Sequence, residues 1–241
     1  MATGRIVWVD IARTVALAGM VIFHFVTDLA LFGHIPAETP VTGAWAVFSR
    51  LIAGSFLFLA GLSLVLAHDK AMHWRPFGRR LALIAGAAAL VSAGTWFAMP
   101  DTFVYFGILH SIAVASVLSL PFLRAPVLLT VAAAVLVFVA PELFRDPAFN
   151  GPWLYWLGLG TEIRPTIDYE PVLPWLAPAL VGVAAGRLAN RTAVWSRLPD
   201  PSPGTCKLAW PGRHIIVIYL VNQPILIALV WAGTQVIGPP A

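Results

Sequence analysis

Charged residues are scarce in this 241-residue chain: Asp, Glu, Lys and Arg make up only 11% of it, whereas soluble domains carry roughly a quarter. Hydrophobic residues make up 59%, and the mean hydropathy is +0.84. This composition excludes an ordinary soluble domain, and the long apolar runs predict a polytopic membrane protein. The net charge of +4 does not indicate nucleic-acid binding, because in a membrane protein an excess of Lys and Arg first reports topology.

Cysteine is almost absent as well. The single residue, Cys206, excludes an internal disulfide and disfavours a cysteine-based metal cluster. His68 and His73 lie five residues apart in a basic loop, a spacing that does not place both imidazoles on one helical face. We therefore expect no metal site.

We also predict no cleavable signal peptide, because the first apolar run is too long and lacks a small-residue cleavage site. We expect this run to remain as a helix. The chain shows no solenoid-type repeat and no boundary that would split it, so we predict one integral-membrane domain over residues 1–241.

Seven apolar runs predict an all-α, polytopic helical bundle with about seven transmembrane helices. The predicted spans are Ile6–Leu29, Trp45–Ala67, Leu81–Ala98, Phe103–Leu123, Pro126–Ala140, Val172–Ala189 and His214–Val236. The tryptophan-rich stretch GPWLYWLGLG at 151–160 is too short and too rich in glycine to span. We place it at the membrane interface, where Trp and Tyr are favoured.

Basic residues are distributed unevenly between the two sides of this map. One side receives eleven of them, the other side only Arg145 and Arg164, while Arg13 and Arg50 lie within spans. The eleven are Arg5, Lys70, Arg75, Arg79, Arg80, Arg124, Arg187, Arg191, Arg197, Lys207 and Arg213. Because Lys and Arg are enriched in cytoplasmic loops, we expect a cytoplasmic N-terminus and a C-terminus on the outer side.

The first span carries two charged residues near its start. Asp10 and Arg13 are three residues apart, so they share a helical face and can form an ion pair near the cytoplasmic end. One interpretation is a structural pair that fixes this helix against its neighbours. The other is a cationic site for an anionic ligand arriving from the cytoplasm, and the sequence leaves both open.

Two further ionisable residues, His24 and Asp28, lie deeper in the same span. They are four residues apart on one face, and at about 1.5 Å per residue His24 lies roughly 21 Å along the helix from Asp10. Such groups are expensive in a membrane and commonly functional. A carboxylate one turn away can fix the tautomer of an imidazole that acts as a general base. We favour catalysis or proton handling over a histidine that only hydrogen-bonds across helices.

Three more polar groups are expected toward the outer side. His110 lies about 10 Å into the fourth span, at a depth similar to that of His24, so we expect the two to face one cavity. By itself His110 is equally well explained as a structural hydrogen-bonding residue. Arg50, at the outer end of the second span, and Asp168, which precedes the sixth, fall at a similar level.

Prolines interrupt two of the predicted helices. Pro174 and Pro178 predict a kink in the sixth span. In the seventh span, Asn222 and Gln223 precede Pro224, which frees a carbonyl in the preceding turn that nearby amides can satisfy. Structural and functional interpretations of the two amides are equally supported.

Five blocks along the chain carry a family resemblance. They are VDIARTVALAGMVIFHFVTDL (9–29), FLFLAGLSLVLA (56–67), FGILHSIAV (106–114), DYEPVLPWLAPALVGVAAG (168–186) and GRHIIVIYLVNQPILI (212–227). In this order they resemble the heparan-alpha-glucosaminide N-acetyltransferase catalytic-domain family, in its compact bacterial form. The resemblance implies a multi-pass acyltransferase of the bacterial inner membrane. Such an enzyme would move an acetyl group from cytoplasmic acetyl-CoA to a sugar hydroxyl or amine on the outer side.

Several positions match the family's motifs, and two depart from them. The matches are Asp10 and Arg13 of Asp-x-x-Arg, His24 and Asp28 of the bacterial His-x-x-x-Asp, His110 of FGILH, and Gln223 of the terminal Gln-Pro. Thr14 stands where a glycine is usual, and Asn222 where a histidine is usual. His34 is the second choice for the base after His24, because the catalytic histidine of lysosomal members aligns nearer to it.

The resulting hypothesis assigns a role to each group. Asp10 and Arg13 bind coenzyme A, whose phosphates also meet the cytoplasmic basic loops. His24 supported by Asp28 is the base, and His110 or Arg50 stabilises the oxyanion. The acceptor is contacted by Arg50, His34, Asp168, Asn222 and Gln223. The expected partners are an acyl-CoA donor, a glycan or amino-sugar acceptor and the bilayer, without nucleic acid; a homodimer is left open. The alternative is a proton-coupled transporter with His24 and Asp28 as its relay, although no inverted repeat supports it.

Overall fold

The computed structural model describes residues 6–68 and 71–238; Arg5 and Lys70, two basic residues used for the topology prediction, lie outside them. The chain divides into two compact units. The terminal unit comprises residues 1–53 and 199–241, and the central unit comprises residues 54–198. The boundary falls within α2, which therefore contributes its first turns to the terminal unit and the remainder to the central unit.

The described residues form helices and no strands, which confirms the predicted all-α fold. The terminal unit contains α1 (Val7–Leu31), η1 (Thr39–Val41), the start of α2 (Gly43–His68), α7 (Pro203–Leu208), α8 (Trp210–Arg213) and α9 (Ile215–Ile237). The central unit contains the rest of α2, α3 (Trp74–Ala98), α4 (Ile108–Leu118), η2 (Pro121–Leu123), α5 (Val127–Phe144), η3 (Pro147–Phe149), η4 (Tyr155–Leu157), α6 (Val172–Arg191) and η5 (Val194–Arg197).

Six of the described helices are long and apolar enough to cross a membrane, namely α1, α2, α3, α5, α6 and α9. The chain is therefore a multi-pass membrane protein. The shorter apolar helix α4 has 11 residues. The relative direction of the first and last helices, α1 and α9, bears on the number of crossings between them.

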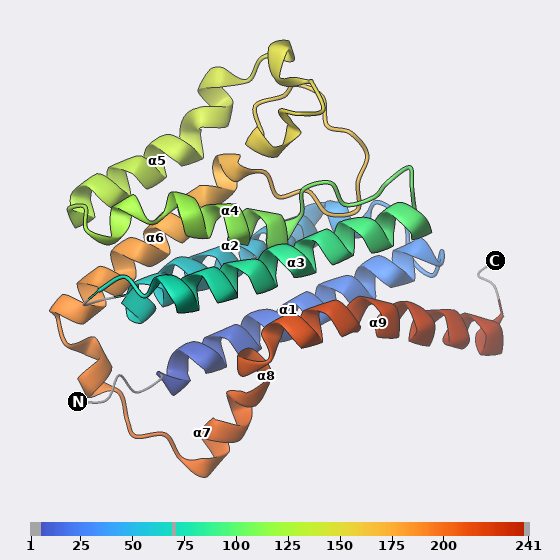
Figure 1. Cartoon of the computed structure of the whole chain (residues 1–241). Coiled ribbons are helices and arrows are strands. Elements are labelled where there is room, and N and C mark those ends of the chain that lie inside the picture. The colour runs from blue at the N-terminus through green and yellow to red at the C-terminus, as the bar shows by residue number, and fades with distance from the viewer. Residues whose placement is uncertain (1–5, 69–70, 239–241) are drawn as a thin grey trace. The chain divides into compact units, whose positions relative to one another are not determined.

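Helices α1 and α9 lie side by side in the terminal unit and run in the same direction (Figure 1). Their contacts advance in the same direction: His24 of α1 pairs with Asn222, and His34, three residues after the end of α1, pairs with Thr234. Two parallel membrane helices at opposite ends of a chain require an odd number of crossings. Six long helices alone would make α1 and α9 antiparallel, so the parallel course of these two helices agrees with the predicted total of about seven spans.

The predicted fourth span differs most from the structure. We predicted a helix over 103–123, but α4 begins only at Ile108, and the residues before it are extended. Phe106 forms an isolated parallel bridge with Tyr169, and the backbone N–H of Glu170 donates to the Phe106 carbonyl at 3.1 Å. This pairing between distant segments uses backbone groups that a longer helix would need for its own hydrogen bonds. No local sequence pattern predicts it.

Two other helices are longer than predicted. Helix α3 begins at Trp74 rather than Leu81, because a proline in the first turn is compatible with a helix and hydropathy alone missed the basic first turns. Helix α5 continues through Pro141 to Phe144, since a proline removes a single N–H from the ladder. In α6, the predicted kink is present as a non-helical backbone at Leu173, directly before Pro174.

The core of the central unit includes a close approach of α2 and α6. A Cβ atom built at Gly182 would lie 2.0 Å from the Phe58 carbonyl oxygen, and one at Gly61 would lie 2.0 Å from the Ala179 oxygen. Only glycine permits backbones to touch at these positions, as in other membrane helix pairs. The same two helices carry the fully buried residues Leu57, Leu64, Leu180 and Val183.

Candidate functional site

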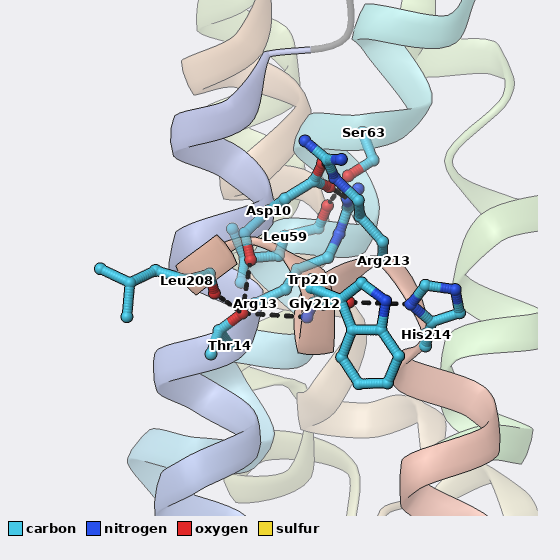
Figure 2. Close-up of polar contacts among 10 residues, drawn as sticks. All are labelled: Asp10, Arg13, Thr14, Leu59, Ser63, Leu208, Trp210, Gly212, Arg213 and His214. Carbon is cyan, nitrogen blue, oxygen red and sulfur yellow. Dashed lines mark hydrogen bonds and ion pairs between the residues drawn. The ribbon is translucent and has the colours of Figure 1, made fainter. Parts of the chain in front are cut away.

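A charged cluster occupies the start of α1. The carboxylate of Asp10 is fully buried and accepts from Nη1 of Arg13 at 2.5 Å and from Nε of Arg213 at 3.3 Å (Figure 2). The pairing of Asp10 with Arg13 confirms the contact predicted from their spacing. Two guanidinium groups against one carboxylate leave the cluster with an excess positive charge. The two arginine side chains are 21% and 32% exposed, so they cover the buried carboxylate and face outward.

Thr14 fastens α8 to α1 beside this cluster (Figure 2). Its hydroxyl donates to the Leu208 carbonyl at 2.8 Å and accepts from the backbone N–H of Gly212 at 2.9 Å. A Cβ at Gly212 would lie 2.0 Å from the Asp10 carbonyl oxygen, so the two helices touch through their backbones. The glycine that is usual at position 14 would make neither hydrogen bond, which gives this departure a structural role.

A second polar layer lies deeper in α1. Nδ1 of His24 is 2.9 Å from Nδ2 of Asn222 on α9, across 198 residues of sequence. No other hydrogen-bond partner of the His24 ring occurs among residues 6–68 and 71–238, so its Nε2 is left for another group. The predicted support of His24 by Asp28 is wrong for this structure, because each residue turns to a separate amide on α9.

Asp28 forms the third layer, one turn above His24. Its side chain is fully buried, and Oδ1 accepts from Nε2 of Gln223 at 2.7 Å. The other carboxylate oxygen of Asp28 and Oε1 of Gln223 are buried without a hydrogen-bond partner in the described part of the chain. Instead of satisfying the carbonyl freed by Pro224, the two predicted amides thus bind ionisable residues of α1.

His34 and Arg50, the remaining predicted residues of the terminal unit, differ from each other. Nε2 of His34, just after the end of α1, is 2.7 Å from the Thr234 hydroxyl near the end of α9, which adds a third polar contact to those of His24 and Asp28 with α9. Arg50 is exposed on α2 and makes no ion pair or hydrogen bond with any residue that the structure describes. It is available to a ligand but is not positioned by a neighbour.

His110 of the central unit uses both ring nitrogens structurally. Its Nδ1 accepts from the backbone N–H of Gly107 at 3.2 Å, at the start of α4, which leaves the proton on Nε2. That nitrogen lies 3.2 Å from the Ser92 hydroxyl, and Ser92 in turn donates to the Val104 carbonyl at 2.6 Å. His110 therefore fixes the beginning of α4 against α3.

Asp168 caps the same helix. Its Oδ2 accepts from the backbone N–H of Ile108 at 3.0 Å, so the carboxylate lies at the positive end of α4. Burial raises the pKa of Asp168 to about 6, although the hydrogen bond from Ile108 opposes the shift. Burial also raises the pKa of the neighbouring Tyr169 hydroxyl, which donates to the Tyr155 carbonyl at 2.8 Å. A structural role explains these contacts of Asp168.

The predicted residues thus fall into two groups. Asp10 with Arg13, His24 with Asn222, and Asp28 with Gln223 come together in the terminal unit, whereas His110 and Asp168 both serve α4 in the central unit. The expected common cavity of His24 and His110 stays a prediction. Sequence reasoning missed Arg213 as the second partner of Asp10, because 203 residues separate them and no local spacing signals the contact.

In the described part of the chain, no group of three or more His, Cys, Asp or Glu side chains lies close enough together to hold a metal ion. His68 and His73, which helical spacing would separate, in fact stack with their ring centroids 5.8 Å apart. The difference arises because α2 ends at His68.

Apolar helices that bury paired ionisable and amide side chains define a membrane protein with a polar site inside its helix bundle. The chain belongs to the family described as heparan-alpha-glucosaminide N-acetyltransferase, catalytic, whose model matches residues 5–224. The match covers every candidate site residue, confirms the resemblance, and indicates a membrane acetyltransferase. Searches among curated proteins and among solved structures gave no match.

Proposed function

We propose that this protein transfers an acetyl group from cytoplasmic acetyl-CoA to a hydroxyl or amine of a sugar on the outer side of a bacterial inner membrane. The observation that carries the proposal is the pair of contacts between α1 and α9, His24 with Asn222 and Asp28 with Gln223. Structural pairing alone does not require two ionisable residues in one membrane helix, and the family supplies acetyl transfer as the chemistry.

His24 is the proposed base. With the amide nitrogen of Asn222 facing Nδ1, as in the structure, the proton of the neutral ring lies on Nε2. A half-turn of the amide presents its oxygen to Nδ1 and so favours the tautomer that carries its proton on Nδ1, which the ring reaches by proton exchange with water. In this tautomer Nε2 can take a proton from the acceptor as it attacks the thioester carbonyl. The same proton then passes to the departing thiolate of coenzyme A.

Asp28 and Gln223 are proposed to hold the acceptor. Their unpartnered buried oxygens can accept hydrogen bonds, and they suit the hydroxyl or amine donors of a sugar. Buried polar atoms are rarely left without a hydrogen bond. A hydroxyl or amine of the sugar that donates to these oxygens would therefore remove the free-energy cost of leaving them unpaired. Arg50 remains the candidate for stabilising the oxyanion, because His110 already uses both of its nitrogens.

The donor would bind at the charged cluster. The excess positive charge of Arg13 and Arg213 over Asp10 suits a phosphate of coenzyme A. Eleven residues of helix separate Arg13 from His24, about 16 Å at 1.5 Å per residue, and the thioester arm would extend over this distance.

Two measurements on purified protein in nanodiscs test the proposal. Acetyl-CoA should raise the midpoint of thermal unfolding in a concentration-dependent way, and radiolabelled acetyl groups should move from acetyl-CoA to glucosamine or another sugar of an acceptor panel. His24→Ala protein should keep the thermal response and lose the transfer, because the donor cluster is intact.

The transport hypothesis predicts different results. A proton-coupled transporter with the His24 and Asp28 relay would show no stabilisation by acetyl-CoA and no acetylated product, and it would move protons across liposomes in response to a solute gradient. Transfer by His24→Ala protein at the wild-type rate would contradict the proposed role of His24.

A further inference from the structure

The central unit contains a pocket of about 440 Å³ that the transfer site does not use. It lies where α2 and α6 end and where η2 is followed by Arg124. Its lining consists of Val65, His68, Leu123, Arg124, Arg187, Asn190 and Arg191. The lining is thus mostly basic and polar, with two aliphatic side chains.

The charges around this pocket are uncompensated. Arg124, Arg187 and Arg191 bring three guanidinium groups to one pocket, and no carboxylate lines it. None of the three pairs with a carboxylate in the part of the chain that the structure describes. The like charges in this pocket repel one another. A bound anion would attract all three guanidinium groups and so offset their repulsion.

Parts of the lining are held in place by their neighbours. Nη1 of Arg187 lies 3.3 Å from the Phe122 carbonyl oxygen, which ties α6 to η2. Oδ1 of Asn190 accepts from Nε1 of Trp195 at 2.7 Å, and this hydrogen bond fixes the orientation of the Asn190 side-chain amide. Two of the polar groups are therefore positioned before any ligand arrives.

Simpler explanations cover only part of these observations. Basic residues in the last turn of a helix are favoured by its dipole, which explains Arg191 at the end of α6 but not Arg124, which follows another element. Cytoplasmic topology explains why these residues lie on one side, but not why three of them surround the same pocket.

We propose that this pocket binds a phosphate group. Guanidinium groups bind phosphate through paired, charge-assisted hydrogen bonds, and arginine is the preferred residue for this task. The phosphate can belong to the headgroup of an anionic lipid, since basic pockets between membrane helices bind such headgroups, or to a soluble phosphate ester. The proposal does not depend on acetyl transfer.

The test uses the full-length protein in nanodiscs at 0.15 M salt, where nonspecific attraction is screened. One arm compares phosphatidylcholine discs with discs containing 20% phosphatidylglycerol. The other arm adds inorganic phosphate, or adenosine 3′,5′-bisphosphate, to pure phosphatidylcholine discs. A rise in the midpoint of thermal unfolding in the first arm identifies the lipid source, and a rise in the second identifies the soluble source.

Variants assign the response to the pocket. Arg124→Gln and Arg191→Gln change exposed side chains. Each should weaken binding and so raise the half-saturating concentration of the active probe about tenfold. Arg187→Gln should do the same where it folds. Arg197→Gln, an exposed basic residue of η5 outside the lining, is the matched control and should respond like the wild type. No response to any probe, or an equal loss in Arg197→Gln, would overturn the proposal.

Discussion

The two units of this protein use their polar side chains differently. In the terminal unit, side chains pair with side chains between α1 and the α8–α9 segment, as in His24 with Asn222 and Asp28 with Gln223. In the central unit, the candidate residues His110 and Asp168 instead bind backbone N–H groups at the start of α4, those of Gly107 and Ile108. The pair of Asp28 and Gln223 keeps one buried oxygen on each side chain without a partner among the described residues, whereas the contacts of His110 complete the start of α4.

The contrast separates two histidines that the sequence makes equivalent. Nδ1 of His24 faces an amide, and its Nε2 has no partner among the described residues. Both nitrogens of His110 are engaged, by Gly107 and by Ser92. Depth in the membrane is therefore a poor criterion for catalysis, and the occupation of both ring nitrogens is a better one.

The largest expected effect comes from exchanging these two histidines for alanine. His24→Ala should lower the rate of acetyl transfer by about 10²–10⁴-fold, the usual contribution of a general base, with little loss of stability. His110→Ala should lower the free energy of unfolding by about 1–3 kcal/mol, because it leaves a buried donor unpaired, and change the rate per folded molecule less than threefold. Radiolabelled transfer and thermal unfolding measure the two quantities. Equal losses of rate would remove the distinction.

Asp10 should be the most sensitive position for stability. Asp10→Asn leaves two guanidinium groups facing each other without a carboxylate, and we expect the free energy of unfolding to fall by about 3–5 kcal/mol. Chemical denaturation in detergent measures it. Arg213→Gln, which keeps the Asp10–Arg13 pair, is the control and should cost less; a larger loss in Arg213→Gln would contradict the central role of the carboxylate.

Gly212 tests the contact of α8 with α1. Gly212→Ala places a Cβ 2.0 Å from the Asp10 carbonyl oxygen and should lower the free energy of unfolding by about 1–3 kcal/mol. Gly233→Ala is the matched variant in α9, where nothing described lies within 4 Å of the new atom. Its helix propensity should leave stability unchanged or slightly higher. A tolerated Gly212→Ala would show that α8 is not held there.

Asp168 provides a smaller, pH-dependent effect in the central unit. Its pKa is raised from 3.8 to about 6, so between these pH values the folded protein retains a proton that the unfolded chain releases. The free energy of unfolding therefore falls as the pH rises through this window and is constant above it.

Asp168→Asn should remove this dependence and raise stability at pH 7 by about 1–2 kcal/mol, because an amide oxygen can still accept from Ile108 without a charge. Thermal unfolding from pH 4 to pH 8 measures the slope. Asp168→Ala, which also loses the hydrogen bond, should be less stable than the wild type, and a slope unchanged in Asp168→Asn would show that another group titrates.

Much of the helical fold follows from the sequence, since apolar length alone predicts the helices that cross the membrane. The start of the fourth helix was not predictable from the sequence, because the backbone at Phe106 pairs with Tyr169, about 60 residues away. The contact of Asp10 with Arg13 was predictable because i,i+3 spacing defines a shared face.

The remaining contacts of the site link positions about 200 residues apart and leave no periodic signal. Asn222 and Gln223 were recognisable as unusual residues in a membrane helix, but their partners were not. Spacing even suggested the wrong partner for His24, since Asp28 lies one turn away and yet turns to Gln223. A single sequence shows which polar residues are costly, and only the packing of α1 with α9 shows how they pair.

The most direct test of the α1–α9 site is a double-mutant cycle between His24 and Asn222, measured on single-turnover acetyl transfer. If Asn222 controls the ring of His24, Asn222→Ala should slow transfer at least tenfold in the wild-type background and have no effect when His24 is already alanine. Equal effects of Asn222→Ala in both backgrounds, with the folded fraction matched, would contradict this account.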